Sequence, residues 1–325
     1  MLTKIGNDFT EPPVSQLFLT HVSCVDHGYI DNTGCVVGGS FHPNFIIGGT
    51  PDPIEKVVVD FSTVKKDVKA AIDLHTNDSI ENGFDHKLWV IEGYSLISGI
   101  SQDVGDDGIT YVLIVTPAIT LKLPVDAVKM IRLIENCVPD YGLVYIGEAF
   151  RSHVYKHLEM KYPKIGLTVE CDNTVDPHLP LKGQQFRYFN YVHGLKDSTS
   201  YGCQNVAHGH ESFFQLNVDG PEHNNRLTQL YNLIADDLNG TVFVREENIA
   251  DRTDNHLSLL YRTGRGEFTM VLDTNSHKVV VLPTETTVEF LSHYVVQKFK
   301  NLLQDENVIS VYVSEGLSKG SIELV

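Results

Sequence analysis

One ordered series of landmarks occurs twice along the chain, and this repeat constrains the fold more than any other feature. A strand-like run that ends in histidine covers 17–21 and again 189–193. A Gly-Cys pair follows each run, at 34–35 and at 202–203. Self-similarity at a nearly constant offset is the sequence signature of a repeated structural unit. We therefore predict an internal duplication.

The same order continues after the Gly-Cys pairs. A segment with apolar residues at helical spacing comes next, then a hairpin-like pair of β-rich runs, a second helix and a closing strand that ends in glutamate. The matched segments are 63–72 and 226–238 for the first helix, 108–123 and 266–282 for the hairpin, 124–136 and 283–302 for the second helix, and 144–148 and 311–315 for the closing strand. The first copy also suggests a loop over 22–35 and a short strand over 57–61.

These patterns predict two domains in a chain of 325 residues, which exceeds the usual size of one domain. The first repeat covers 1–150, a connector covers 151–185, and the second repeat covers 186–325. Two helices and local strand pairs in each repeat indicate an α+β fold, with two helices on one face of an antiparallel sheet. Because sheet edges must be paired or covered, we expect the sheets to join within and between chains, in a barrel-like homo-oligomer.

The composition excludes several classes of partner. The formal charge of −17 argues against binding nucleic acid or an anionic membrane surface, since both need basic patches. No apolar run approaches the roughly 20 residues needed to span a bilayer. The five cysteines form no disulfide framework, and the N-terminus lacks the apolar core of a signal peptide. A cytoplasmic protein is the resulting expectation.

The second repeat carries a candidate metal site. If His208 and His210 lie in a strand, the period of two places both imidazoles on one face, and His193 ends another strand-like run. Three histidines with an open fourth position form a common catalytic zinc site, and Cys203 lies close by in sequence. On residue chemistry alone, a solvated, histidine-rich loop fits the same stretch equally well.

The motifs resemble those of the 6-pyruvoyl- and 6-carboxy-tetrahydropterin synthase family, which has the tunnelling fold. The second repeat supplies His193, Cys203, His208-Gly209-His210, Pro283-Thr284-Glu285 and Glu315, and the first repeat supplies Asp60-Phe61, Phe84-Asp85-His86 and Glu148. The resemblance therefore implies two tandem tunnelling-fold repeats whose motif set is shared between the two copies.

The family resemblance also implies roles for these residues. It implies that Zn²⁺ is held by His193, His208 and His210. It implies that Cys203, Asp85 and His86 are catalytic and that Glu315, Glu148, Thr284 and Glu285 bind a pterin. Zinc would polarise side-chain hydroxyls, and a cation beside Cys203 lowers a thiol pKa from ~8.5 toward neutrality. The expected reaction is that of a carbon–oxygen lyase, which converts 7,8-dihydroneopterin triphosphate to a 6-carboxy or 6-pyruvoyl tetrahydropterin with loss of triphosphate.

The first repeat departs from the family pattern. Ser40 stands where the spacing expects a zinc histidine, and we read His42 and His21 as structural or vestigial. In the second repeat, Asn255 stands where the Asp-His pair is expected, between Asp254 and His256, and the contribution of these three stays open. We therefore predict a composite site, in which one repeat supplies metal and thiol and the other supplies Asp85 and His86.

Two other functions remain in view. One is a pterin- or purine-binding protein that keeps the fold and the zinc but has lost turnover. The other is a tunnelling-fold enzyme that acts on another purine-like ring, although uricase-like members need no zinc. The sequence decides neither the 6-substituted product, nor the pathway (7-deazapurines such as queuosine, biopterin or folate), nor the ring stoichiometry.

Overall fold

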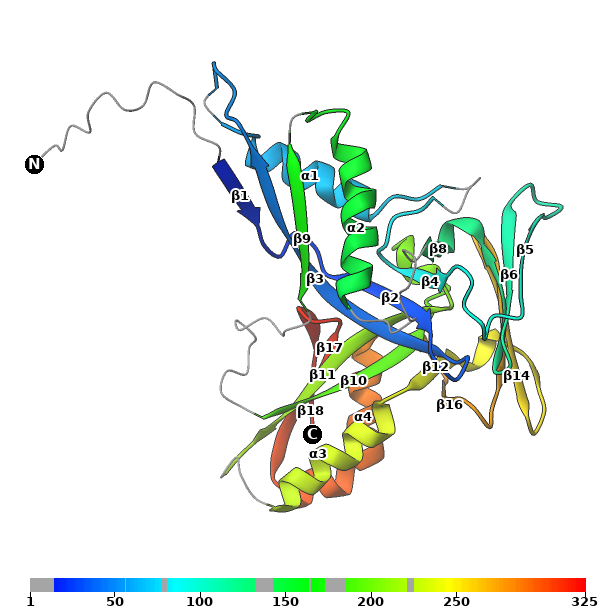
Figure 1. Cartoon of the computed structure of the whole chain (residues 1–325). Helices are drawn as coiled ribbons and strands as arrows, with labels where there is room; N and C mark the ends of the chain where they lie inside the picture. Colours follow the sequence, from blue (N-terminus) through cyan, green and yellow to red (C-terminus); the bar gives the residue numbers. More distant parts are fainter. Residues whose placement is uncertain are drawn as a thin grey trace, which may run out of the picture.

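The computed structural model describes residues 15–55, 57–76, 81–131, 143–163, 165–172, 185–220 and 225–325, with the backbone alone at 143–148 and 172. Over these residues the chain forms four α-helices and three six-stranded sheets (Figure 1). The mixture of helices and sheets confirms the α+β class. Among the described residues, no helix is both long and apolar enough to cross a membrane.

The first sheet comes from the N-terminal half and has the order β1-β3-β2-β4-β8, with β9 beside β3. Its strands are β1 (Ser15–Leu19), β2 (Val25–Ile30), β3 (Val36–Gly49), β4 (Lys87–Ile91), β8 (Val128–Ile131) and β9 (Gly166–Asp172). Helices α1 (Phe61–Ile72) and α2 (Leu143–Leu158) pack on one face, in a core that includes Trp89 and Phe150. Helix α1 begins where it does because the Asp60 carboxylate accepts a hydrogen bond from the Thr63 N–H.

The second sheet comes from the C-terminal half and has the order β16-β12-β10-β11-β17-β18. Its strands are β10 (Phe186–His193), β11 (His208–Val218), β12 (Thr241–Arg245), β16 (Lys278–Leu282), β17 (Val308–Glu315) and β18 (Lys319–Leu324). Helices α3 (Asn225–Leu238) and α4 (Val288–Asp305) cover one face with a second core. If β18 is left out of this sheet and β1 out of the first, the two sheets have the same strand order, because the first sheet then reads β8-β4-β2-β3-β9.

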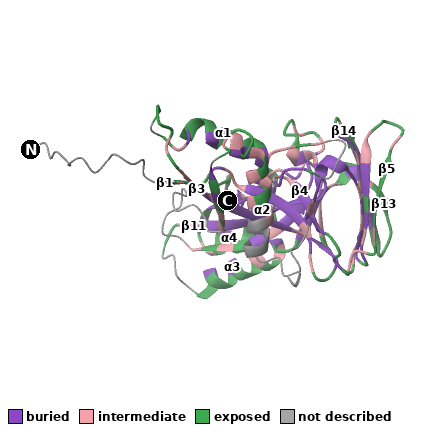
Figure 2. Ribbon diagram, turned by 45° about the horizontal axis from the view of Figure 1, so that its top comes forward, coloured by how far each residue is buried: buried purple, intermediate pink, exposed green. Residues whose placement is uncertain are grey.

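The third sheet joins the two halves of the chain. Its order is β13-β14-β15-β7-β6-β5, and β15 pairs antiparallel with β7, so that Met270 lies opposite Leu121. Its strands are β5 (Gly99–Val104), β6 (Thr110–Val115), β7 (Ile119–Pro124), β13 (Ile249–Arg252), β14 (His256–Thr263) and β15 (Gly266–Asp273). A third core packs this sheet against strands of the other two, which gives the molecule its buried centre (Figure 2).

The first and second sheets also meet directly, at two glycines. A Cβ atom on Gly209 of β11 would lie 2.5 Å from the Cα atom of Gly38 in β3, and one on Gly38 would lie 2.1 Å from the Tyr191 carbonyl oxygen. Both distances are far shorter than any contact that a real Cβ atom makes. Only glycine therefore allows β3 and β11 to cross this closely. The crossing brings β2 and the turn before β4 next to the start of β11.

Several expected elements differ from the structure. The first and second sheets are mixed rather than antiparallel, since β4 pairs parallel with both β2 and β8, and β12 does so with β10 and β16; the third sheet is antiparallel. Residues 25–30 form β2 instead of a loop, and 57–61 lead into α1 instead of forming a strand. The run 266–282 is no hairpin, because β15 and β16 belong to different sheets; the hairpin is β14–β15.

The second helix and closing strand expected in the N-terminal half were also wrongly predicted. A single 3₁₀ turn at Val125–Ala127 and strand β8 replace the helix expected over 124–136, of which 132–136 lie outside the described residues. Residues 144–148 belong to α2. The strand that lies beside β3, in the place that β17 takes beside β11, is β9, within the stretch expected as a connector. Phe150, Val154 and Leu158 are all fully buried at a spacing of four, which is the helical signal. In the second half, α4 begins at Val288 rather than at Pro283.

Candidate metal centre and active site

Three buried histidines converge where β10 ends and β11 begins. His193 is the last residue of β10 and pairs with His208, the first residue of β11, while His210 follows on the same face two residues later. Their exposed fractions are 1 %, 0 % and 0 %. One ring nitrogen of each lies within 4.8 Å of those of the others. The alternation expected from the His-Gly-His motif is thus present, and the solvated-loop alternative is wrong.

Each imidazole turns its Nδ1 atom toward a protein oxygen. The three contacts are 2.7 Å from His193 to the Thr286 carbonyl, 2.7 Å from His208 to the Asn205 carbonyl, and 3.2 Å from His210 to the Asp26 carboxylate. Because carbonyl oxygens can only accept, the Nδ1 atoms of His193 and His208 carry the hydrogen, which leaves their Nε2 atoms as bare lone pairs; His210 Nδ1 makes an ion-pair contact with its carboxylate. This arrangement is typical of histidines that bind a metal through Nε2.

The three Nε2 atoms fit a bound cation. Those of His193 and His210 lie 3.1 Å apart, and that of His208 is buried without a hydrogen-bond partner. An unsatisfied buried polar atom such as His208 Nε2 costs about 1–3 kcal/mol. Burial, helped by the nearby His210, also lowers the pKa of His193 well below its usual value, and burial does the same for His208. Neutral imidazoles are the form that coordinates a divalent transition metal, so this donor set suits one.

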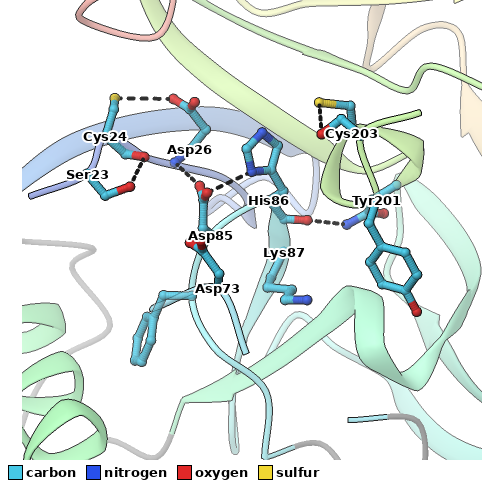
Figure 3. A network of polar contacts seen from close by, with 12 residues as sticks. Ser23, Cys24, Asp26, Asp73, Asp85, His86, Lys87, Tyr201 and Cys203 are labelled. Atoms are coloured by element: carbon cyan, nitrogen blue, oxygen red, sulfur yellow. Dashed lines mark hydrogen bonds and ion pairs between the residues drawn. The ribbon is translucent and has the colours of Figure 1, made fainter. Parts of the chain in front are cut away.

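The Asp85–His86 pair of the first half lies against this centre. His86 Nδ1 is 2.9 Å from the Asp85 carboxylate, and its backbone adopts φ = 56° directly before β4. His86, Cys203 and His208 offer donor atoms within 4.8 Å of one another. Figure 3 shows the imidazole between Asp85 and Cys203. The approach requires Gly202, because a Cβ atom there would lie 2.6 Å from the Cβ of His86.

Cys203 and His86 have electrostatics suited to an ion pair. Burial lowers the pKa of His86, but the charge and hydrogen bond of Asp85 outweigh this and raise it well above its usual value. Burial raises the pKa of Cys203, but the hydrogen bond and positive charge of His86, with a hydrogen bond to Ser200, lower it overall. The pair therefore favours a thiolate beside an imidazolium, which is the nucleophilic and basic form of cysteine.

The residues expected to bind substrate lie in different surroundings, and Glu315 is the one described next to a histidine of the triad. Glu315 ends β17, and its Oε1 lies 3.9 Å from His210 Nε2 and 3.5 Å from Lys319 Nζ. Glu285 instead accepts hydrogen bonds from the Arg245 side chain at 2.8 Å and from the Asp197 backbone at 3.0 Å. The Thr284 hydroxyl donates to the Glu285 carbonyl. The Glu148 side chain lies outside the described part of the chain, and its backbone is in α2 rather than at a strand end.

Asp26 is a site residue that the sequence analysis missed. It is 2 % exposed as the second residue of β2, and its carboxylate contacts His210 and accepts a 2.5 Å hydrogen bond from Ser40. Burial raises the pKa of Asp26, but the contact with His210 and the charge of His86 outweigh this and lower it below its usual value. Asp26 was missed because the Asp, Gly and Asn residues around it suggested a loop rather than a strand. Asn205 and Thr286 contact the histidines through carbonyl oxygens, which no sequence pattern identifies.

Strand register corrects the expected correspondence between the halves. In the second sheet, Tyr191 of β10 lies opposite both His210 and the first residue of β12. In the first sheet, His27 of β2 takes the equivalent place, opposite both Gly39 and the first residue of β4. His210 therefore corresponds to Gly39 rather than to His42. Ser40 does not replace a ligand but holds Asp26. By the same register, Asn239-Gly240 corresponds to Asp85-His86, while Asp254, Asn255 and His256 are exposed around the start of β14.

Comparisons with known proteins give only distant similarities. No protein-family model matches the sequence, and a search of curated proteins found no match. Among solved structures, a 6-pyruvoyltetrahydropterin synthase from Plasmodium vivax is similar at a TM-score of 0.33 and 12 % identity, covering 49 % of this chain and 91 % of that one. The Plasmodium falciparum synthase gives 0.31 and 14 %, covering 48 % and 91 %. An uncharacterized protein from Wolinella succinogenes gives 0.30 and 12 %, covering 43 % and 95 %. Similarity at this level does not establish a shared fold or function.

Proposed function

We propose that this protein is a zinc-dependent pterin synthase of the carbon–oxygen lyase class. Its substrate would be 7,8-dihydroneopterin triphosphate, and its product a 6-carboxy or 6-pyruvoyl tetrahydropterin. The single observation that carries the proposal is the buried triad of His193, His208 and His210 with the Cys203–His86 pair beside it. A metal-binding triad next to an activated thiol suits proton abstraction from a carbon that bears hydroxyl groups.

The residues would divide the chemistry as follows. Zinc, when bound by the three histidines, would act as a Lewis acid toward the hydroxyl groups of the pterin side chain. Cys203, as thiolate, would take a proton from the adjacent carbon, and the triphosphate would leave with the electron pair of its carbon–oxygen bond. His86, held by Asp85, would then return the proton to the ring, so that the side chain is oxidised as the dihydropterin ring is reduced and no outside redox agent is needed. Glu315 would accept hydrogen bonds from the 2-amino and N3–H edge of the ring.

We also propose that the chain is a tandem duplication of one unit with a single working site. Support comes from the matching strand order of the first two sheets and from the third sheet, which receives three strands from each half. The corresponding positions Gly39 and Asn239-Gly240 lack the required side chains, so a reciprocal site would have neither ligands nor an acid–base pair. A homo-oligomer is proposed because β5 and β13 leave mostly exposed edges on the third sheet.

The test combines metal analysis with turnover. We expect purified protein to contain about one zinc per chain, by the open three-histidine arrangement. It should release triphosphate from 7,8-dihydroneopterin triphosphate, with the product identified by mass spectrometry. Cys203→Ala and His86→Ala should each abolish turnover while zinc stays bound. Cys171→Ala in β9 and His256→Ala in β14 are the matched controls and should stay active. Zinc without turnover would support a non-catalytic binder, and full activity in His86→Ala would refute the composite site.

A further inference from the structure

Asp26 contacts both parts of the candidate site, and it comes from the opposite half of the chain to the three histidines. We propose that Asp26 is a positioning residue through which the N-terminal half sets the metal affinity of the C-terminal triad. This inference rests on the proposed metal site, and it adds a residue and a coupling between the halves that the proposed reaction does not require.

The Asp26 carboxylate is held rigidly against a single ligand. Its Oδ1 lies 3.2 Å from His210 Nδ1 and accepts a 2.5 Å hydrogen bond from the Ser40 hydroxyl. The Ser40 oxygen in turn accepts from the Glu211 N–H at 3.0 Å, next to His210 in β11. Gly316 closes the other side, since a Cβ atom there would lie 2.6 Å from Asp26 Oδ1. The carboxylate is thus fixed by both β3 and β11.

The backbone of Asp26 performs a different task from its side chain. Its N–H donates to the Asp85 carboxylate at 2.9 Å (Figure 3), and its carbonyl accepts from the His86 N–H at 2.6 Å. Both bonds survive any substitution of the side chain other than proline. A change of the carboxylate therefore alters the metal ligand and leaves the anchor of the acid–base pair in place.

His210 differs from the other two ligands in its partner. His193 and His208 face neutral carbonyl oxygens, whereas His210 faces a carboxylate. A carboxylate fixes the ring and makes the imidazole more basic, and loss of such a partner usually weakens metal binding 10–100-fold. Its negative charge also offsets part of the charge of a divalent ion in a buried site. We therefore assign the main control of affinity to the His210–Asp26 contact.

The experiment compares metal affinity in matched variants. Zn²⁺ is titrated into metal-free full-length protein in competition with a chromophoric chelator. Asp26→Asn keeps the shape and an acceptor oxygen but removes the charge, and we expect affinity to fall about 10–100-fold. Asp126→Asn is the control, because Asp126 is also a buried carboxylate of the first half that contacts the second, through Arg265 instead of a ligand. It should bind Zn²⁺ like the unmodified protein.

Each outcome decides a separate question. Unchanged affinity in Asp26→Asn, or an equal loss in Asp126→Asn, overturns the role of Asp26 while the metal site stands. Failure of the unmodified protein to bind Zn²⁺ overturns the proposed function itself. If Asp26→Asn does not fold, Ser40→Ala serves instead, since it keeps the charge but releases the carboxylate. A loss of a few-fold supports the proposal, and no loss overturns it.

Discussion

The crossing of β3 and β11 makes Gly209 the position where one added methyl group should do most damage. Alanine there would place Cβ 2.5 Å from Gly38 Cα and 2.7 Å from the Tyr191 carbonyl oxygen. Non-bonded carbon atoms settle at about 3.5–4.0 Å, so the strands must separate by about 1 Å. Both neighbours are backbone atoms and cannot rotate away. We therefore expect Gly209→Ala to lower the free energy of unfolding by about 3 kcal/mol, at the upper end of ordinary overpacking costs.

The same displacement should reach the metal centre, because Gly209 lies between two of its ligands, His208 and His210. A shift of about 1 Å exceeds the tolerance of a coordination site, so we expect Zn²⁺ affinity to fall at least roughly tenfold. The assays are urea denaturation of the metal-free protein and chelator competition.

Gly99→Ala in β5 is the control for this prediction, since a Cβ atom there meets nothing within 4 Å. Its stability should stay within about 0.5 kcal/mol of the unmodified protein. Equal stability and equal metal affinity in the two alanine variants would refute the close crossing of the sheets.

Three further predictions concern buried charges. Burial, with the charge of Arg265, lowers the pKa of Lys87 to about 7, against ~10.4 in an unfolded chain. The unfolded chain thus binds more protons between these values, so stability should rise from pH 7 to 10, and Lys87→Met should flatten that slope in urea midpoints. Arg265→Ala leaves the buried Asp126 without its opposite charge, although the Tyr201 hydroxyl still donates to it, and should cost about 3–5 kcal/mol, part of which the double variant with Asp126→Asn recovers. Because His86 lowers the Cys203 pKa, His86→Gln should move the pH profile of Cys203 alkylation upward, as measured by mass spectrometry.

The sequence was informative where a pattern belongs to one element. The alternation of His208 and His210 predicted their common face, and α1, α3 and the closing strand β17 followed from periodicity. Short apolar runs were ambiguous, since periodicity alone does not separate a buried strand from a helix. Residues 144–148 illustrate this, because their β-rich run is the first part of α2. The helical signal lies further on, in the buried residues Phe150, Val154 and Leu158.

Sequence periodicity did not predict the contacts between different strands and helices. Asp26 contacts His210 only because two glycines let the sheets cross, and no residue pattern near Asp26 in the sequence indicates this contact. The third sheet was missed for the same reason, since periodicity shows which face of a strand is buried but not which strand lies beside it. Spacing from the Gly-Cys pairs also misplaced the counterpart of Asp85-His86. The loops of the two halves differ in length, so strand register is the reliable guide.

That register also gives a physical reason to regard His86 as functional. His86 and Gly240 occupy the same place, directly before β4 and β12, and both are left-handed, at φ = 56° and 70°. Glycine adopts this conformation freely, whereas another residue pays roughly 1–2 kcal/mol. The C-terminal half makes the same turn with the less costly residue, so the fold itself does not need a histidine there. What the histidine adds is an imidazole fixed by Asp85 and aimed at Cys203. Strained backbone persists where the surrounding structure compensates for it, and we assign the benefit of His86 to the proposed site rather than to stability.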